Sequence, residues 1–95
     1  MKRITERMIL LSLAELSKLE KVADVCENEY AKNPESAKAE NDFDAAYSAQ
    51  YEKMIECVDY IVSYSNGAID AKTARRMIVG DLRTQLIGML SATVG

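Results

Sequence analysis

The chain has 95 residues, enough for one domain, and 48% of them are hydrophobic, so it can bury a core without metals or disulfides. Its one proline and four glycines are too few for the many tight turns of a small β-sandwich or barrel, which favours an all-α protein. The chain has no histidine, which excludes the Ser-His-Asp and Cys-His nucleophile systems and the common zinc sites. Its net charge of −3 is opposite to that of most proteins that bind DNA.

The composition also bears on where the protein works. The longest apolar run near the N-terminus covers residues 8–11, which is shorter than a signal-peptide core or the ~20 residues of a membrane span. Two cysteines are too few for a disulfide-stapled secreted module. We therefore expect a cytoplasmic, non-enzymatic protein that does not enter a membrane and needs no cofactor or metal.

The first predicted helix covers residues 5–32. Thr5 is a suitable N-cap, and Ile4 and Ile9 have the spacing of a hydrophobic staple around it. Apolar residues then recur at helical spacing at Ile9, Leu16, Leu19, Ala23, Cys26 and Tyr30. Further apolar residues widen this stripe on both sides in the first half of the helix. That half is therefore expected at the centre of a bundle or beneath a second chain.

The second predicted helix covers residues 34–65. Asn33 can act as its N-cap with Pro34 at the first helical position, although Asn41-Asp42 offers an alternative start. The apolar face comprises Phe43, Ala46, Tyr47, Tyr51, Met54, Cys57, Val58, Ile61 and Tyr64. Gly67 is expected to end the helix with a positive φ.

The third predicted helix covers residues 70–92, with Asp70 as its N-cap. Its apolar row has a strict spacing of four: Ala74, Ile78, Leu82, Leu86 and Leu90. Gly80-Asp81 can also break this helix and give a fourth one, with Asp81 as a new N-cap. Short connections favour antiparallel neighbours, so the predicted fold is a single-domain, self-associating three-helix bundle running up, down and up.

The two cysteines fall on the apolar stripes of different predicted helices. In a hairpin that turns near residues 33–34, Cys26 lies opposite residue 41 and about 24 Å along the helix from Cys57. A disulfide requires Cα atoms within about 7 Å. Both thiols are therefore expected to be reduced and buried.

Acidic residues are concentrated in the middle of the chain, where residues 24–59 hold ten acidic and three basic side chains. On the second helix, Glu52, Glu56 and Asp59 are predicted to share one outward ridge, with Tyr60 as an exposed aromatic beside it. Such a ridge suits a basic partner protein, including one that normally holds nucleic acid, which the ridge would then mimic. A simple solvated face is the alternative.

Small residues recur on the third helix at a spacing close to four. They are Gly80, Thr84, Gly88 and Ser91, with Ile87 at their flank. Small residues at this spacing let two backbones approach closely, which predicts a homodimer contact. The alternative is a weakly helical outer surface.

Residues 60–78 can also be interpreted as a helix-turn-helix motif, in which Thr73, Arg75 and Arg76 lie at the start of the recognition helix. The long preceding helix and the acidic chain weigh against nucleic-acid binding. The leading prediction is thus a non-enzymatic protein-interaction module, of the small bacterial, phage or mobile-element kind, that binds or inhibits a partner through its acidic surface. A DNA-binding transcriptional regulator is the alternative.

Overall fold

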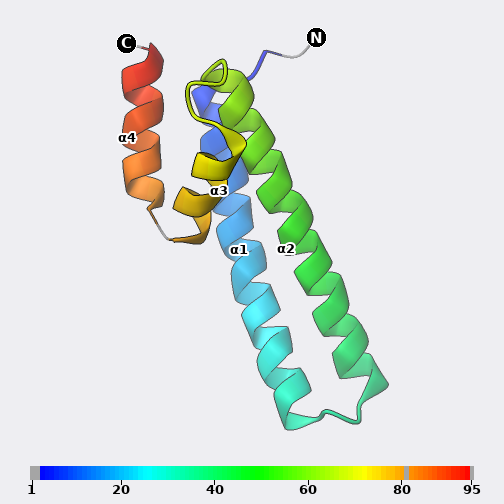
Figure 1. Cartoon of the computed structure of the whole chain (residues 1–95). Coiled ribbons are helices and arrows are strands. Elements are labelled where there is room, and N and C mark those ends of the chain that lie inside the picture. Colours follow the sequence, from blue (N-terminus) through cyan, green and yellow to red (C-terminus); the bar gives the residue numbers. More distant parts are fainter. Residues whose placement is uncertain (1–2, 81, 95) are drawn as a thin grey trace.

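The computed structural model describes residues 3–80 and 82–94, and this part of the chain forms four helices without strands. They are α1 (Glu6–Lys32), α2 (Ala37–Tyr64), α3 (Ala71–Val79) and α4 (Arg83–Val94) (Figure 1). The all-α prediction is confirmed. The four-helix alternative is correct, and a continuous third helix over 70–92 is wrong.

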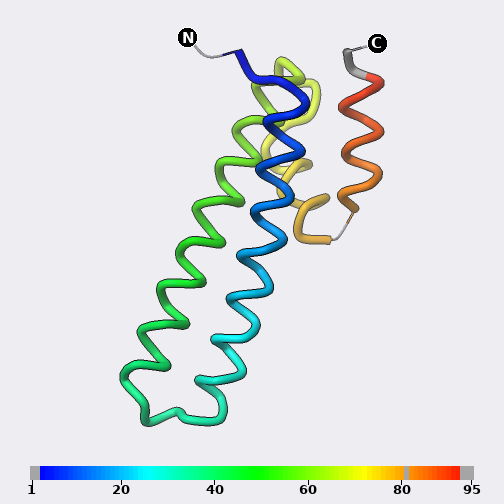
Figure 2. The backbone as a smooth tube through the Cα atoms, turned by 180° about the vertical axis from the view of Figure 1, so that it is seen from behind, coloured from blue at the N-terminus to red at the C-terminus, as the bar shows by residue number. Residues whose placement is uncertain are grey.

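The two long helices form an antiparallel hairpin, and α3 and α4 pack against only one end of it (Figure 1). The molecule is accordingly elongated, with extents of 52 × 28 × 20 Å. Figure 2 shows from behind that the other end of the hairpin, around the α1–α2 connection, extends beyond both short helices. The four-helix end therefore carries the main core.

The first helix begins as its sequence predicts. The Thr5 side chain accepts a hydrogen bond from the Met8 backbone N–H at 3.2 Å. Ile9 is fully buried, and Ile4 packs against the same core from the other side of the cap. The capping residue and the flanking apolar pair indicate the same starting residue, so local sequence was enough to predict where α1 begins.

The start of α2 differs from both predicted positions. Asn33 ends α1 instead, since its backbone N–H donates to the carbonyls of Glu29 and Tyr30. The cap of α2 is Ser36, whose hydroxyl accepts from the Ala39 N–H at 3.2 Å. Residues 33–36 form a turn in which the Ser36 N–H donates to the Asn33 carbonyl at 3.0 Å, and α2 begins only after this turn.

The connection from α2 to α3 contains two residues with positive φ, Asn66 at 52° and Gly67 at 84°. The Gly67 N–H donates to the Val62 carbonyl at 3.0 Å, which closes the end of α2 as its sequence predicts. The buried Ser65 hydroxyl then accepts from the Ile69 N–H, also at 3.0 Å. Asp70 caps α3 by accepting from the Thr73 N–H at 2.7 Å.

The third helix is short because the chain turns at Gly80. A Cβ at this position would lie 3.0 Å from the Arg76 carbonyl oxygen, and the Leu82 N–H donates back to the Met77 carbonyl at 2.8 Å. The turn reverses the chain, so that α4 runs beside α3 (Figure 1). The proposed N-cap, Asp81, lies outside the described residues.

A single cluster of side chains forms the core where the four helices meet. Its largest fully buried side chains are Ile9, Leu16, Cys57, Ile61, Ile78, Leu86 and Leu90. The predicted row of the C-terminal region is thus buried except at Leu82, which is 40% exposed. In the extended part of the hairpin, Phe43 stacks on Tyr30 and meets the edge of Tyr47.

The first half of α1 is not fully covered by the other helices, because Leu10 and Leu11 retain 39% and 55% of their surface. Of the two predicted alternatives, a fully enclosed position at the centre of the bundle is wrong. The helix has neighbours on only some of its sides, so an apolar circumference is not fully covered within one chain. The described residues cover these two leucines only in part, and the predicted cover by a second chain stays a prediction.

The two cysteines differ in accessibility, and this difference is testable. Both are free, as expected. The expectation that both are buried is correct for Cys57, which is fully buried, and wrong for Cys26, which is only half-buried. Burial raises the pKa of the Cys57 thiol to about 11, whereas a free thiol titrates near 9.0.

We expect a thiol reagent at pH 8 to label Cys26 rapidly in the native protein and Cys57 only after unfolding in urea. A Cys26→Ser variant should lack the rapid phase, and two rapid thiols in the native protein would contradict the burial of Cys57.

Candidate binding groove between α2 and α3

A groove of about 530 Å³ runs between α2 and α3. Its lining comes from α2 at Tyr51, Met54, Ile55 and Val58, and from α3 at Ala71, Lys72, Arg75, Arg76 and Val79. A second hollow continues it along α2 to Tyr47 and Gln50 and shares several of these residues. We call the two together the α2–α3 groove.

The groove exists because α3 covers the apolar face of α2 only in part. Its lining includes both the first and the last residue of α3, Ala71 and Val79, so the groove follows α3 along its whole length. Tyr47 and Ile55 of α2 remain 57% and 43% exposed, and Val79 is 68% exposed. Contiguous exposed apolar surface of this kind marks an interaction surface more often than scattered single residues do.

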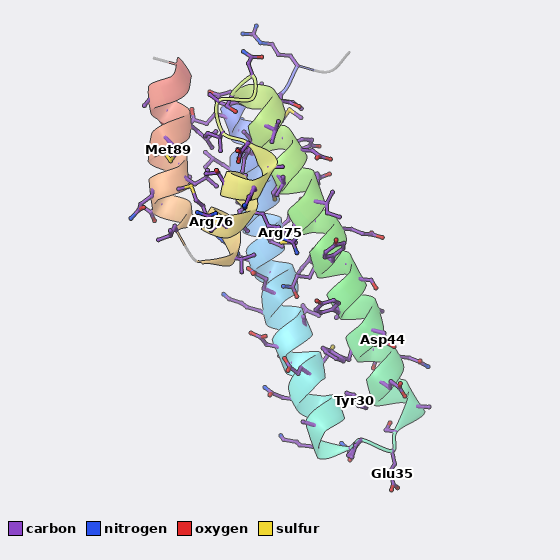
Figure 3. The ribbon with its side chains drawn as sticks, viewed as in Figure 1. Tyr30, Glu35, Asp44, Arg75, Arg76 and Met89 are labelled. Carbon is purple, nitrogen blue, oxygen red and sulfur yellow. The ribbon has the colours of Figure 1, made fainter. Side chains whose placement is uncertain are left out.

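Three cations, Lys72, Arg75 and Arg76, stand on the α3 side of the groove. They follow one another at helical spacing and are exposed, and both arginines project from α3 in Figure 3. Among the described residues, no carboxylate lies within 4.0 Å of any of the three. The groove lining itself contains no Asp or Glu.

The predicted acidic ridge is only partly present. Glu52 and Asp59 are exposed on α2. Glu56 instead lies between α1 and α2, where its carboxylate accepts hydrogen bonds from Ser12 at 3.1 Å and Lys53 at 2.7 Å. The expectation that all three point outward is therefore wrong for Glu56, because α1 supplies a polar partner on that side of α2.

Tyr60 is also not the exposed aromatic that the sequence predicted. It is half-buried against the core, and its hydroxyl donates to Glu56 at 3.4 Å. Tyr60 thus belongs to the same inter-helix network as Glu56. Of the four predicted partner-binding residues, Glu52 and Asp59 remain on the free surface.

Lys53 connects the two helices through this network. Its ammonium contacts Glu15 of α1 at 2.9 Å and Glu56 at 2.7 Å. Hydrogen bonds from Lys53 to Glu56 and then to Glu15 hold the pKa of Lys53 above its usual range. The same bond, followed by those from Ser12 and Tyr60, lowers the pKa of Glu56 despite its partial burial. Lys53 and Glu56 are therefore ionised at neutral pH, and their contacts with Glu15 and Ser12 link α2 to α1.

The residues predicted for self-association do not form one free face. Thr84 and Gly88 are exposed on α4, and Gly80 lies in the turn before it. Ile87 packs against the core, and Ser91 donates a hydrogen bond to Glu6 of α1 at 3.1 Å. A continuous small-residue surface is therefore wrong, because the break at Gly80 separates its first member and α1 contacts its last.

The attachment of α4 to α1 escaped the sequence prediction. Arg83 donates to the Ser17 hydroxyl at 2.6 Å and to the Glu20 carboxylate at 2.7 Å. These contacts join residues more than sixty positions apart in the sequence, so no local sequence pattern predicts them. They fix the beginning of α4 against the middle of α1.

The three residues of the helix-turn-helix alternative differ in their exposure and surroundings. Thr73 is half-buried, and its N–H is used by the Asp70 cap, a bond that also lowers the pKa of Asp70. Arg75 and Arg76 are exposed and border the groove. The two arginines therefore stand beside an apolar surface instead of forming part of a wholly polar reading face.

Sequence reasoning placed Tyr51, Met54 and Val58 in the predicted core face and missed Ile55 and Val79 as groove residues. The available signal was the width of the apolar stripe on the second helix, which exceeds what one neighbouring helix covers. Recognising the groove required knowledge of how α3 packs along α2, which local sequence patterns do not specify.

No protein-family model, curated protein or solved structure gives a significant match to this chain. Within residues 3–80 and 82–94, no helix has both the length and the apolar character needed to cross a membrane. In the same residues, no three cysteine or carboxylate side chains converge as metal ligands would.

Proposed function

We propose that this protein is a non-enzymatic interaction module that binds an amphipathic helix of a partner protein in the α2–α3 groove. The observation that supports the proposal is the exposed apolar floor of the groove. Tyr51, Ile55 and Val79 stand together there at 44%, 43% and 68% exposure. Their burial by a partner would remove apolar surface from water, the main favourable term in protein association.

The dimensions of the groove suit a helix. Its α2 side extends from Tyr47 to Val58, a rise of about 17 Å at 1.5 Å per residue. That length accepts about three turns of a partner helix, whose apolar residues at i, i+4 and i+7 would face the floor. A third helix packed on α2 and α3 would also complete the cover that the short α3 leaves unfinished.

The test uses a defined probe, a helical peptide of about 14 residues with a leucine row at i, i+4, i+7 and i+11 and glutamine elsewhere. A hydrocarbon crosslink on its outer face keeps the peptide helical when free. We expect this neutral probe to bind the full chain and to perturb the backbone amide signals of α2 and α3 in NMR spectra.

A pair of matched variants distinguishes groove binding from general stickiness. The Ile55→Gln/Val79→Gln variant should bind the probe about tenfold more weakly or worse, because two apolar contacts are lost. The Val22→Gln/Val25→Gln variant changes two equally exposed apolar residues of α1, outside the groove, and should bind like wild type. No binding at about 1 mM peptide, or equal losses in both variants, would contradict the proposal.

A further inference from the structure

The charge of the α2–α3 groove is opposite to that of the chain as a whole. The chain has 15 acidic and 12 basic residues, yet the groove lining contains three cations and no carboxylate. Clefts lined by one sign of charge favour a ligand of the other sign. The occupant of this groove should therefore carry negative charge beside its apolar surface.

The exposed cations of the groove form no ion pair within the described residues, whereas two half-buried cations of the fold do. Lys53 and Arg83 each contact a carboxylate within 2.9 Å. Lys72, Arg75 and Arg76 form no such pair in the described part of the chain, and Lys72 and Arg76 only act on the pKa of Asp70 from a distance. The guanidinium groups of Arg75 and Arg76 thus remain available for carboxylates, which they can bind through two parallel hydrogen bonds.

The opposite rim of the groove has the other sign. Glu52 and Asp59 are exposed on α2, three and four residues from Ile55, and so lie next to it on the helix surface. One rim is therefore acidic and the other basic, with the apolar floor between them. A ligand that is negative on all sides, such as duplex DNA with one charge per ~1.7 Å, would meet repulsion at the α2 rim.

We infer that the partner helix is acidic along one flank only, and that Arg75 and Arg76 pair with the carboxylates of that flank. The inference rests on the proposed function, since it names the chemistry of the helix that the groove binds. The apolar row of the partner supplies most of the affinity, and the charges select the partner and its direction in the groove.

The experiment compares three helical peptides with the same leucine row. One carries glutamates along one flank, one carries glutamates along both flanks, and the third is the neutral glutamine probe. We expect the one-flank peptide to bind about three- to tenfold more tightly than the neutral probe, the gain typical of two exposed ion pairs. It should also bind more tightly than the two-flank peptide, and its advantage should shrink between about 0.1 M and 0.5 M salt.

Matched variants assign the effect to the two arginines. In Arg75→Gln/Arg76→Gln the one-flank peptide should lose its advantage over the neutral probe. In Arg7→Gln/Lys18→Gln the same charge is removed from exposed positions of α1, and the advantage should persist. Because all four positions are exposed, neither variant threatens the core.

Each other outcome has a distinct meaning. If the neutral probe binds but the acidic flank adds nothing, or adds as much in the arginine variant, the inference fails and the proposed function stands. If no peptide binds, the proposed function fails with it. If a duplex DNA of about 20 base pairs binds more tightly than the one-flank peptide and requires Arg75 and Arg76, the groove reads nucleic acid and the inference is overturned.

Discussion

We expect the Ile61→Ala variant to lose about 3 kcal/mol of unfolding free energy, within the range of roughly 2–5 kcal/mol for large core aliphatic residues. Ile61 is fully buried, and it sits in the cluster that joins α2 to the three other helices. Removing its outer carbons leaves a cavity at the place where all four helices meet. For a domain whose total stability is on the order of 5–15 kcal/mol, this is a large fraction.

The matched control is Ile55→Ala, the same change on the same helix at a side chain that is 43% exposed. It should cost less than about 1 kcal/mol, because less apolar surface returns to water and no closed cavity forms. Urea unfolding followed by circular dichroism measures both. The Ile61 variant should also melt at least about 10 °C lower than wild type. Equal losses at the two positions would contradict the burial difference on which both the core and the groove depend.

The features that the sequence predicted correctly are those in which a few neighbouring residues carry the whole signal. Thr5 and Asp70 cap their helices as expected, because a capping side chain and the N–H it accepts from lie three residues apart. Gly67 has the expected positive φ for the same local reason. The predicted start of α2 was wrong because the sequence offers three suitable N-caps, Asn33, Ser36 and Asn41. Only the place where α1 ends decides among them.

The candidate groove was beyond local reasoning because it depends on how α3 packs along α2. Tyr51, Met54 and Val58 were predicted as core, and they line the groove because α3 covers that face of α2 only in part. The position of Glu56 between the two helices, by contrast, could have been predicted from the register of the hairpin. A hairpin that turns near residue 34 places residue 12 opposite residue 56 and residue 15 opposite residue 53, and these are the pairs that form. Reading Ser12 and Glu15 against that register would have indicated polar contacts between the helices.

The Glu56→Gln variant should therefore be less stable than wild type, whereas Glu52→Gln should not. Glu56 accepts from Ser12, Lys53 and Tyr60, and an amide keeps none of the charge that strengthens these bonds. Its side chain is 36% exposed, so solvent screening limits the expected loss to about 1 kcal/mol. Glu52 is exposed and one turn from Glu56, so its neutralisation removes only a like-charge repulsion and should leave stability unchanged or slightly higher.

The pH dependence of this difference tests its electrostatic origin. The bond from Lys53 lowers the pKa of Glu56 below 4.5 in the folded protein, so the unfolded chain binds a proton at this residue more readily than the folded one. The stabilisation is therefore fully present above about pH 4.5 and is lost as the pH falls through the lower, folded value. Urea unfolding from pH 7 to pH 3 should show a constant gap between wild type and Glu56→Gln that closes at the acid end, since a protonated glutamate resembles glutamine. A gap that stays constant down to pH 3 would show that packing, and not the charge of Glu56, accounts for the loss. No gap at neutral pH would show that Glu56 faces solvent and belongs to the acidic ridge after all.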